Sequence, residues 1–213
     1  MSKPKIIITE PILESDFRGA WQLVESHLFK NNITIESLEE SSIGEVLIAK
    51  DGDAASLTDK VSAGAGAPAS PESGMRGKVI GMIQSRRPGR IFKYIDEKYI
   101  SLDKIKVAKE ELGFISLIVL APEYRGKGIG KLLINKALAN QKEWGAKCVG
   151  AFAWQASPNS GSQKLFESCG FVPIKLHEEP WKSFSERVGP EGYFCTVCSN
   201  PCRCDYLEMV KYL

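Results

Sequence analysis

Hydrophobic residues recur with two different periods along this chain, and the two periods alternate. Uninterrupted apolar runs at residues 117–120 and 148–154 are typical of buried strands. Between these runs, residues 130–144 place their apolar side chains on one helical face and their lysines on the other. The pattern therefore predicts a strand, an amphipathic helix and a second strand in succession.

The same reasoning extends to both ends of the chain. We expect strands at residues 5–13, 45–49, 78–85, 111–120, 148–154, 172–176 and 206–213, and helices at residues 17–28, 130–144 and 163–169. Strands that alternate with helices predict an α/β sheet, and we expect the last two strands to close it in antiparallel fashion. The whole chain, 1–213, is predicted to form a single domain.

One stretch lacks either period. Residues 53–77 are rich in Ala, Gly, Ser and Pro, and only Leu57, Val61 and Met75 are sizeable apolar residues there. Such a stretch buries too little apolar surface to offset its ordering entropy. It is predicted to be a disordered loop inserted between two strands, with a substrate-binding lid as the alternative.

Composition narrows the possible functions. The chain has 213 residues, of which 43% are hydrophobic, so it can bury one good core and a small appendage. A net charge of +2, from 28 basic and 26 acidic residues, disfavours nucleic acid as the main partner. No apolar stretch has the length of a signal segment or a membrane span, so we expect a soluble, cytoplasmic protein with no membrane partner.

A glycine-rich turn lies between the central apolar strand and the amphipathic helix. Residues 125–130 read Arg-Gly-Lys-Gly-Ile-Gly. Glycines let the backbone approach an anion, and the helix that follows directs its free N–H groups to the same place, so this turn is predicted to hold a phosphate. Lys131 and Leu132 follow the last glycine, where a nucleoside triphosphate loop would need Ser or Thr, and the glycine spacing does not fit a dinucleotide fingerprint.

The turn resembles the acyl-CoA loop of the GCN5-related N-acetyltransferases, the GNAT family. Arg125, Gly128 and Gly130 match its Arg-x-x-Gly-x-Gly motif, and residues 120–124 match the hydrophobic-x-Pro-x-Tyr sequence that precedes it. A second family motif is matched by residues 159–171, from Asn159 through Phe166 to Gly-Phe. This resemblance implies a mixed, mostly antiparallel central sheet with flanking helices.

The resemblance also implies acetyl-CoA as co-substrate and direct transfer of its acetyl group to a primary amine of a small molecule or peptide. Backbone groups near Leu120 would hold the pantetheine arm, and N–H groups of the glycine turn would face the pyrophosphate. The cofactor-binding residues implied are Leu120, Arg125, Gly126, Lys127, Gly128, Ile129, Gly130, Lys131, Asn159 and Phe166. Loops at residues 91–109 and 176–193 would border the acceptor amine.

The sequence indicates the residues that would transfer protons less clearly than the residues that would bind the cofactor. Phe166 stands where many family members have a tyrosine thought to protonate the CoA sulfur, and Ser116 stands where a glutamate often acts as base. Ser116, by ordering a water, Glu111 and His177 are therefore the catalytic candidates. Glu39 and Glu40 are further alternatives, whereas His27 is expected to be a packed or surface residue.

Four of the six cysteines fall in the connection at residues 178–204, and the family motifs do not predict them. Cys195, Cys198, Cys202 and Cys204 have spacings that let four thiolates bind one Zn²⁺. Free or redox-active thiols, disulfides and an iron–sulfur cluster remain alternatives. The cluster also supports an alternative function, a non-catalytic acyl-CoA-binding or metal- and redox-responsive module on the same fold.

Overall fold

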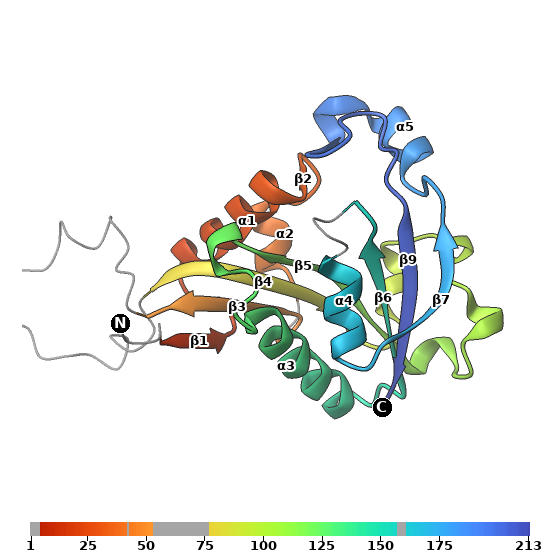
Figure 1. Ribbon diagram of the computed structural model, residues 1–213, viewed down its shortest axis with the longest axis horizontal. Coiled ribbons are helices and arrows are strands. Elements are labelled where there is room, and N and C mark those ends of the chain that lie inside the picture. The colour runs from red at the N-terminus through yellow and green to blue at the C-terminus, as the bar shows by residue number, and fades with distance from the viewer. Residues whose placement is uncertain (1–4, 42, 53–76, 157–160) are drawn as a thin grey trace, which may run out of the picture.

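A seven-stranded sheet forms the centre of the protein in a computed structural model that describes residues 5–41, 43–52, 77–156 and 161–213 (Figure 1). The strand order is β1-β3-β4-β5-β6-β9-β7. The strands are β1 (Ile6–Thr9), β3 (Val46–Asp51), β4 (Lys78–Arg86), β5 (Leu112–Leu120), β6 (Cys148–Trp154), β7 (Val172–His177) and β9 (Tyr206–Tyr212). Every pairing is antiparallel except that of β5 with β6, so the predicted mixed, mostly antiparallel sheet is confirmed.

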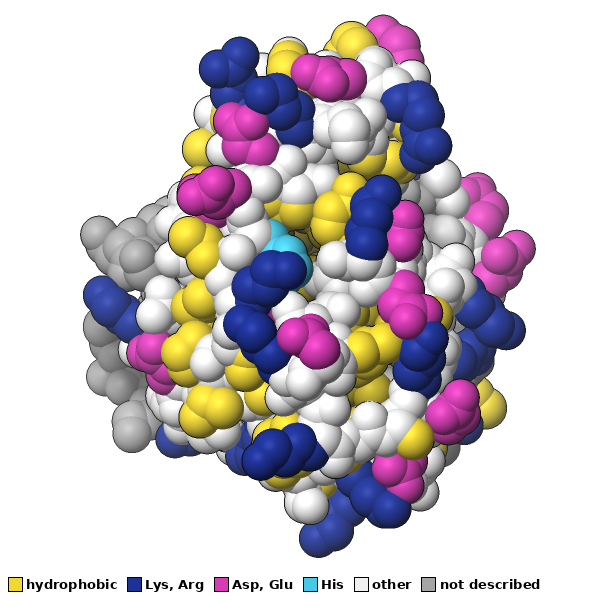
Figure 2. All heavy atoms as spheres, turned by 90° about the vertical axis from the view of Figure 1, so that its right-hand side faces the viewer, with side chains coloured by type: hydrophobic (Ala, Val, Ile, Leu, Met, Phe, Trp, Pro, Cys, Tyr) yellow, Lys and Arg dark blue, Asp and Glu magenta, His cyan; other side chains and the backbone are white. Residues whose placement is uncertain are grey.

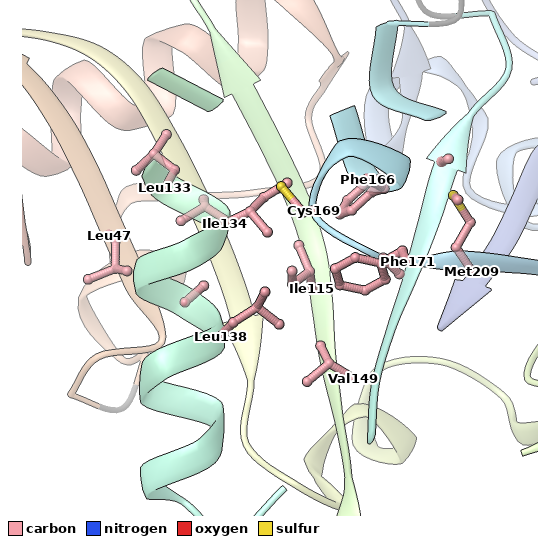
Figure 3. Packing of buried hydrophobic residues seen from close by; sticks show 14 of the residues in the cluster. Leu47, Ile115, Leu133, Ile134, Leu138, Val149, Phe166, Cys169, Phe171 and Met209 are labelled. Atoms are coloured by element: carbon pink, nitrogen blue, oxygen red, sulfur yellow. The ribbon is translucent and has the colours of Figure 1, made fainter. Parts of the chain in front are cut away.

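Helices cover both faces of the sheet, because each strand alternates its side chains between two cores. On one face, α3 (Ile129–Glu143) and α4 (Gly161–Ser168) bury the apolar stripe that the sequence predicted. Figure 3 shows Leu133, Ile134 and Leu138 of α3 in this core, together with Ile115 of β5. On the other face lie α1 (Glu14–His27) and α2 (Ile35–Glu39).

The rest of the second face is covered by short helices between β4 and β5, and a further cluster lies beyond β7. The short helices η3 (Arg90–Lys93), η4 (Glu97–Tyr99), η5 (Leu102–Lys104) and η6 (Lys109–Glu111) pack against β6 and β9. Beyond β7, α5 (Lys182–Gly192) and the cysteine-rich residues form a separate small cluster. There β8 (Phe194–Cys195) pairs with β2 (Phe29–Lys30), which directly follows α1.

The sequence did not predict β2, β8 or α5. Strands of two residues show no periodicity, and α5 is interrupted at Gly189, whose φ of 65° is not helical. The first strand is also shorter than the predicted 5–13 and ends at Thr9. The insertion predicted over 53–77 lies, except for Gly77, outside the described residues.

A buried ion pair joins α1 to the sheet. Lys50 Nζ of β3 lies 2.7 Å from Asp16 Oδ1, and both side chains are almost completely buried. The other Asp16 oxygen accepts hydrogen bonds from the Ile12 and Leu13 N–H groups at 3.1 and 3.2 Å. Asp16 thus holds the start of α1 and neutralises a lysine that the fold buries.

Candidate cofactor and acceptor site

The two central strands separate partway along their length. β5 pairs with β6 only where residues 112–115 face residues 148–151, although both strands continue further (Figure 1). The cause lies in a β-bulge, because Gln84 faces Leu117 while Ser85 faces Ile115, which leaves Ser116 as the extra residue. Beyond it, among the described residues, the side of β5 that faces β6 has no strand partner, so an extended ligand can hydrogen-bond there.

The glycine turn lies at the end of this open edge. It follows the short helix η7 (Pro122–Tyr124), and Gly126 and Gly128 adopt left-handed φ values of 74° and 81°. A Cβ at either position would meet nothing within 4 Å, so the backbone conformation and not packing requires glycine here. Gly128 is the N-cap of α3, whose first N–H groups have no partner within the helix. The turn and the helix end together form a site suited to a phosphate anion.

Gly130 has a different role from the other two glycines of the turn. A Cβ on Gly130 would lie 2.9 Å from Leu165 of α4 and 3.4 Å from Leu120. The absence of a side chain therefore lets α4 and the end of β5 pack close to the first turn of α3. Its N–H still belongs to the free N-terminal set of α3.

Side chains of the turn hold it against the sheet. Arg125 Nε donates to the Leu120 carbonyl at 3.1 Å, and the Tyr124 hydroxyl donates to Asp51 Oδ2 at 2.7 Å. That hydrogen bond and burial raise the pKa of Tyr124 to about 12. The Lys127 ammonium lies 5.0 Å from the centre of the Tyr124 ring, a cation–π contact.

Two more basic side chains border the turn. Lys131 is exposed on the first turn of α3. His27, at the end of α1, lies close enough to Arg125 that partial burial, and then the Arg125 charge, lower its pKa. No local sequence pattern associates His27 with this site, since the contact joins residues far apart in the chain.

The second family motif lies mostly in the core. Phe166 is 2% exposed and packs edge-on against Phe171, with ring centroids 5.1 Å apart (Figure 3). A phenyl ring donates no proton, so this residue contributes packing to the site. Asn159 lies outside the described residues.

Of the candidates for proton transfer on β5, Ser116 lies where the strands part. Its Oγ is buried and has no hydrogen-bond partner among the described residues. Glu111 precedes the strand, about 16 Å from Ser116 at the usual rise of a strand. Its carboxylate pairs with Lys147 and accepts from the Ala108 N–H at 3.2 Å, and these contacts lower its pKa. Glu39 and Glu40 are exposed around the end of α2.

His177 belongs to a buried polar group at the end of β7. Its Nε2 lies 2.9 Å from Glu208 Oε2, and Glu208 is fully buried. The same carboxylate accepts hydrogen bonds from the Ser101 N–H and hydroxyl at 2.9 and 2.7 Å. Sequence reasoning missed Glu208 and Ser101, although a single carboxylate between Leu207 and Met209 in an apolar strand was the available signal.

His177 also lines a shallow hollow on the second face of the sheet, whose side chains are packed too closely to admit a water molecule. This hollow, which we call the acceptor hollow, is lined by Tyr99, Phe152, His177, Pro180, Trp181 and Tyr206. Figure 2 shows this side of the protein, with a histidine in a depression bordered by hydrophobic side chains. Because Phe152 belongs to β6, the hollow adjoins the strand that forms one side of the open edge.

The four cysteines of the predicted cluster do come together. Their Sγ atoms all lie within 4.8 Å of one another, and Cys195, Cys202 and Cys204 are buried. Hydrogen bonds from the Cys202 and Cys204 thiols hold the pKa of Cys195 far below its usual range, whereas contacts with Cys195 and Cys202 raise the pKa of Cys204. The group has the donor set and spacing of a metal site.

One segment of the chain matches a known family, and it contains the glycine turn, the open edge of β5, and helices α3 and α4. Residues 61–171, just over half of the chain, match the model of the Acetyltransferase (GNAT) family. The chain belongs to this family. Across the described parts of this GNAT protein, every helix is too short or too polar to cross a membrane.

Known proteins agree with this assignment. The chain is 36% identical over 67 residues to GCN5-related N-acetyltransferase 4, chloroplastic, of Arabidopsis thaliana, which covers 32% of this chain and 22% of that protein. It is 32% identical over 103 residues to an uncharacterized N-acetyltransferase of Chlorobaculum tepidum, covering 48% and 57%. The matched segments therefore span less than two thirds of these relatives' lengths.

Solved structures share the fold of the whole chain. The crystal structure of Arabidopsis thaliana NAA60 in complex with acetyl-CoA is 14% identical, has a TM-score of 0.61, and is matched over 98% of this chain and 99% of that one. At this identity the likeness establishes the architecture of the sheet and its helices and no more.

Proposed function

We propose that this protein is an N-acetyltransferase that transfers the acetyl group of acetyl-CoA directly to a primary amine of a small molecule or a peptide. The observation that carries the proposal is the parting of β5 and β6 at Ser116, with the N-terminus of α3 at the end of the free edge. The left-handed glycines fit the co-substrate, because a Cβ at Gly126 or Gly128 would meet no protein atom within 4 Å, so the space beside the turn is open to a ligand.

Acetyl-CoA supplies an acetyl group activated as a thioester. N–H groups at residues 126–131 hold its pyrophosphate, and the free backbone of residues 117–120 pairs with its amide arm. As the new C–N bond forms and the C–S bond breaks, backbone N–H donors on the open edge stabilise the charge on the carbonyl oxygen. One proton has to leave the amine nitrogen, and one has to reach the sulfur.

Two groups can take the amine proton, Ser116 on β5 and the His177–Glu208 pair, and strands β6 and β9 lie between Ser116 and His177. The Ser116 hydroxyl has unused hydrogen-bonding capacity and orients a water beside the amine. Alternatively, His177, held by the buried carboxylate of Glu208, accepts the proton. Phe166 has no hydroxyl to offer, so solvent protonates the departing sulfur.

Release of CoA thiol from acetyl-CoA in the presence of a panel of amines and peptides tests the proposal. We expect turnover with at least one primary amine, and a fall in kcat of about 100-fold for His177→Gln with an unchanged dissociation constant for acetyl-CoA. Turnover that is equally fast in His177→Gln would remove His177 from the reaction. Acetyl-CoA binding without turnover of any amine would refute the transferase.

A second candidate function follows from two observations. Phe166 offers no acid, and the cysteine cluster, for which zinc is the candidate metal, packs with Trp181 and Tyr206 of the acceptor hollow. Both suit a non-catalytic acyl-CoA-binding module that responds to metal or redox state. The same assay separates the two functions, because the module binds acetyl-CoA and never consumes it.

The proposed setting is the reducing cytoplasm, where cysteine thiols stay available to bind metal. The proposed partner is the amine substrate. A net charge of +2 disfavours nucleic acid as a partner.

A further inference from the structure

The cysteine-rich segment reaches across to the other half of the protein. We call residues 178–205, between β7 and β9, the cysteine cap. Its strand β8 pairs with β2, and Thr196 Oγ1 donates to the Leu28 carbonyl at 2.9 Å. Asn31 Nδ2 donates to the Pro190 carbonyl at 3.0 Å, and the rings of Phe29 and Tyr193 stack 5.6 Å apart.

These contacts join elements from either side of the separated strands. Residues 28–31 follow α1, which packs on β4 and β5, whereas the cap leads into β9, the neighbour of β6 (Figure 1). The cap therefore connects the two halves of the sheet by a second route on the acceptor side. Trp181 of the cap and Tyr206 just after it line the acceptor hollow.

The cap has little apolar core of its own. Its buried residues are the three cysteines, Tyr193 and Ser185. Polar contacts fold the chain around the sulfurs: Asn200 Nδ2 donates to the Ser185 and Tyr193 carbonyls at 2.7 and 3.0 Å, and the Cys202 N–H donates to Ser185 Oγ at 2.8 Å. Segments this short usually need a metal or covalent cross-links to hold a fixed fold.

We propose that Cys195, Cys198, Cys202 and Cys204 bind one Zn²⁺ that holds the cap over the acceptor side of the site. A tetrahedral zinc with bonds of about 2.3 Å places its sulfurs about 3.8 Å apart. Of the six sulfur pairs, Cys195 and Cys204 are 3.7 Å apart, Cys198 and Cys202 3.8 Å, and Cys198 and Cys204 3.3 Å, and all six lie within 4.8 Å. Each thiol loses its proton as its sulfur bonds to the metal, so four protons are released.

N–H groups are in place around the sulfurs, as a negatively charged tetrathiolate requires. The Arg203 N–H donates to Cys198 Sγ at 3.2 Å. The Trp154 indole N–H is buried beside Cys204. Because Trp154 is the last residue of β6, this tryptophan connects the metal site to a strand of the cofactor edge.

Metal analysis of the full chain, purified under reducing conditions without added metal, tests the site. We expect one zinc per chain and, after exchange with Co²⁺, the intense thiolate-to-cobalt absorption of a tetrathiolate site. Cys198→Ser should lose the metal, whereas Cys169→Ser, which removes a buried thiol outside the cluster, should keep it. The absence of a stoichiometric metal, an iron–sulfur spectrum, or zinc kept in Cys198→Ser would overturn the site.

The role of the metal in positioning the acceptor rests on the proposed function, so it needs a separate measurement. On removal of zinc with a chelator, we expect the KM for the amine to rise about tenfold or more, because small displacements of the acceptor are costly. The dissociation constant of acetyl-CoA should stay within about twofold, since the contacts that hold the glycine turn come from β3, β5 and α4. An unchanged amine KM in zinc-free protein would overturn this role, and zinc binding in a protein without turnover would refute only the proposed function.

Discussion

Replacing Gly128 by Ala separates the cost of a strained turn from the loss of a ligand, because the chain contains a matched control. Gly128 caps the N-terminus of α3 with φ 81°, and Gly145 follows its C-terminus with φ 84°. A Cβ at either position meets nothing within 4 Å. Each substitution should therefore cost only the left-handed backbone penalty of about 1–2 kcal/mol.

The two variants should lose similar stability, with melting temperatures lower by roughly 2–8 °C for a chain of this size. Only Gly128→Ala should lose affinity for CoA. Alanine keeps the backbone N–H, but its Cβ would push the pyrophosphate away from the N–H groups of the turn. Losing one charge-assisted hydrogen bond in this way is worth about 1.5–3 kcal/mol, or roughly 10- to 150-fold in the dissociation constant.

Isothermal titration of both variants and the parent protein with CoA, together with thermal melts, measures both quantities. Equal affinities in Gly128→Ala and Gly145→Ala would show that the turn does not hold the phosphates. Weaker binding in both variants would assign the effect to α3 as a whole.

Three further predictions concern the turn, the core and the chemistry. Tyr124→Phe should lower the unfolding free energy by about 1.5 kcal/mol at neutral pH. Because the pKa of Tyr124 is raised from 10.0 to about 12, the stability difference between parent and variant should be constant below pH 10 and vanish toward pH 12 in denaturant titrations. A stability difference that persists above pH 12 would contradict the hydrogen bond. Asp16→Asn, which removes the negative charge that pairs with the buried Lys50, should cost about 3–5 kcal/mol and lower the melting temperature by roughly 6–20 °C. Glu14→Gln, in an exposed pair on the same helix, should cost under about 1 kcal/mol. Equal effects would argue against the buried pair. Ser116→Ala removes a hydroxyl without a hydrogen-bond partner among the described residues, so thermal melts should show no loss of stability. The kcat at saturating acetyl-CoA should nevertheless fall. An unchanged kcat would exclude Ser116 from the transfer of the amine proton.

The sheet was largely predictable from the sequence because its strands and covering helices have clear periods. Strand β6 matches its predicted bounds, and α3 begins one residue before its predicted start. The bulge at Ser116 was not predictable, since it arises from the register between β4 and β5, and a single chain pattern does not contain that register.

The candidate site likewise has residues that the sequence predicted and contacts that it did not. The cysteines were predicted to meet because short spacings keep their sulfurs close, whatever the rest of the fold does. The contact of His177 with Glu208 and that of His27 with Arg125 join distant parts of the chain, so no local pattern indicated them.

The central claim is that backbone N–H groups of the glycine turn and of the free edge of β5 hold acetyl-CoA. Titration of isotopically labelled protein with CoA, followed by amide NMR, observes these groups one by one. We predict that the largest shifts occur at residues 126–131 and 117–120. Unchanged amides at these residues, or shifts confined to another part of the chain, would contradict the claim.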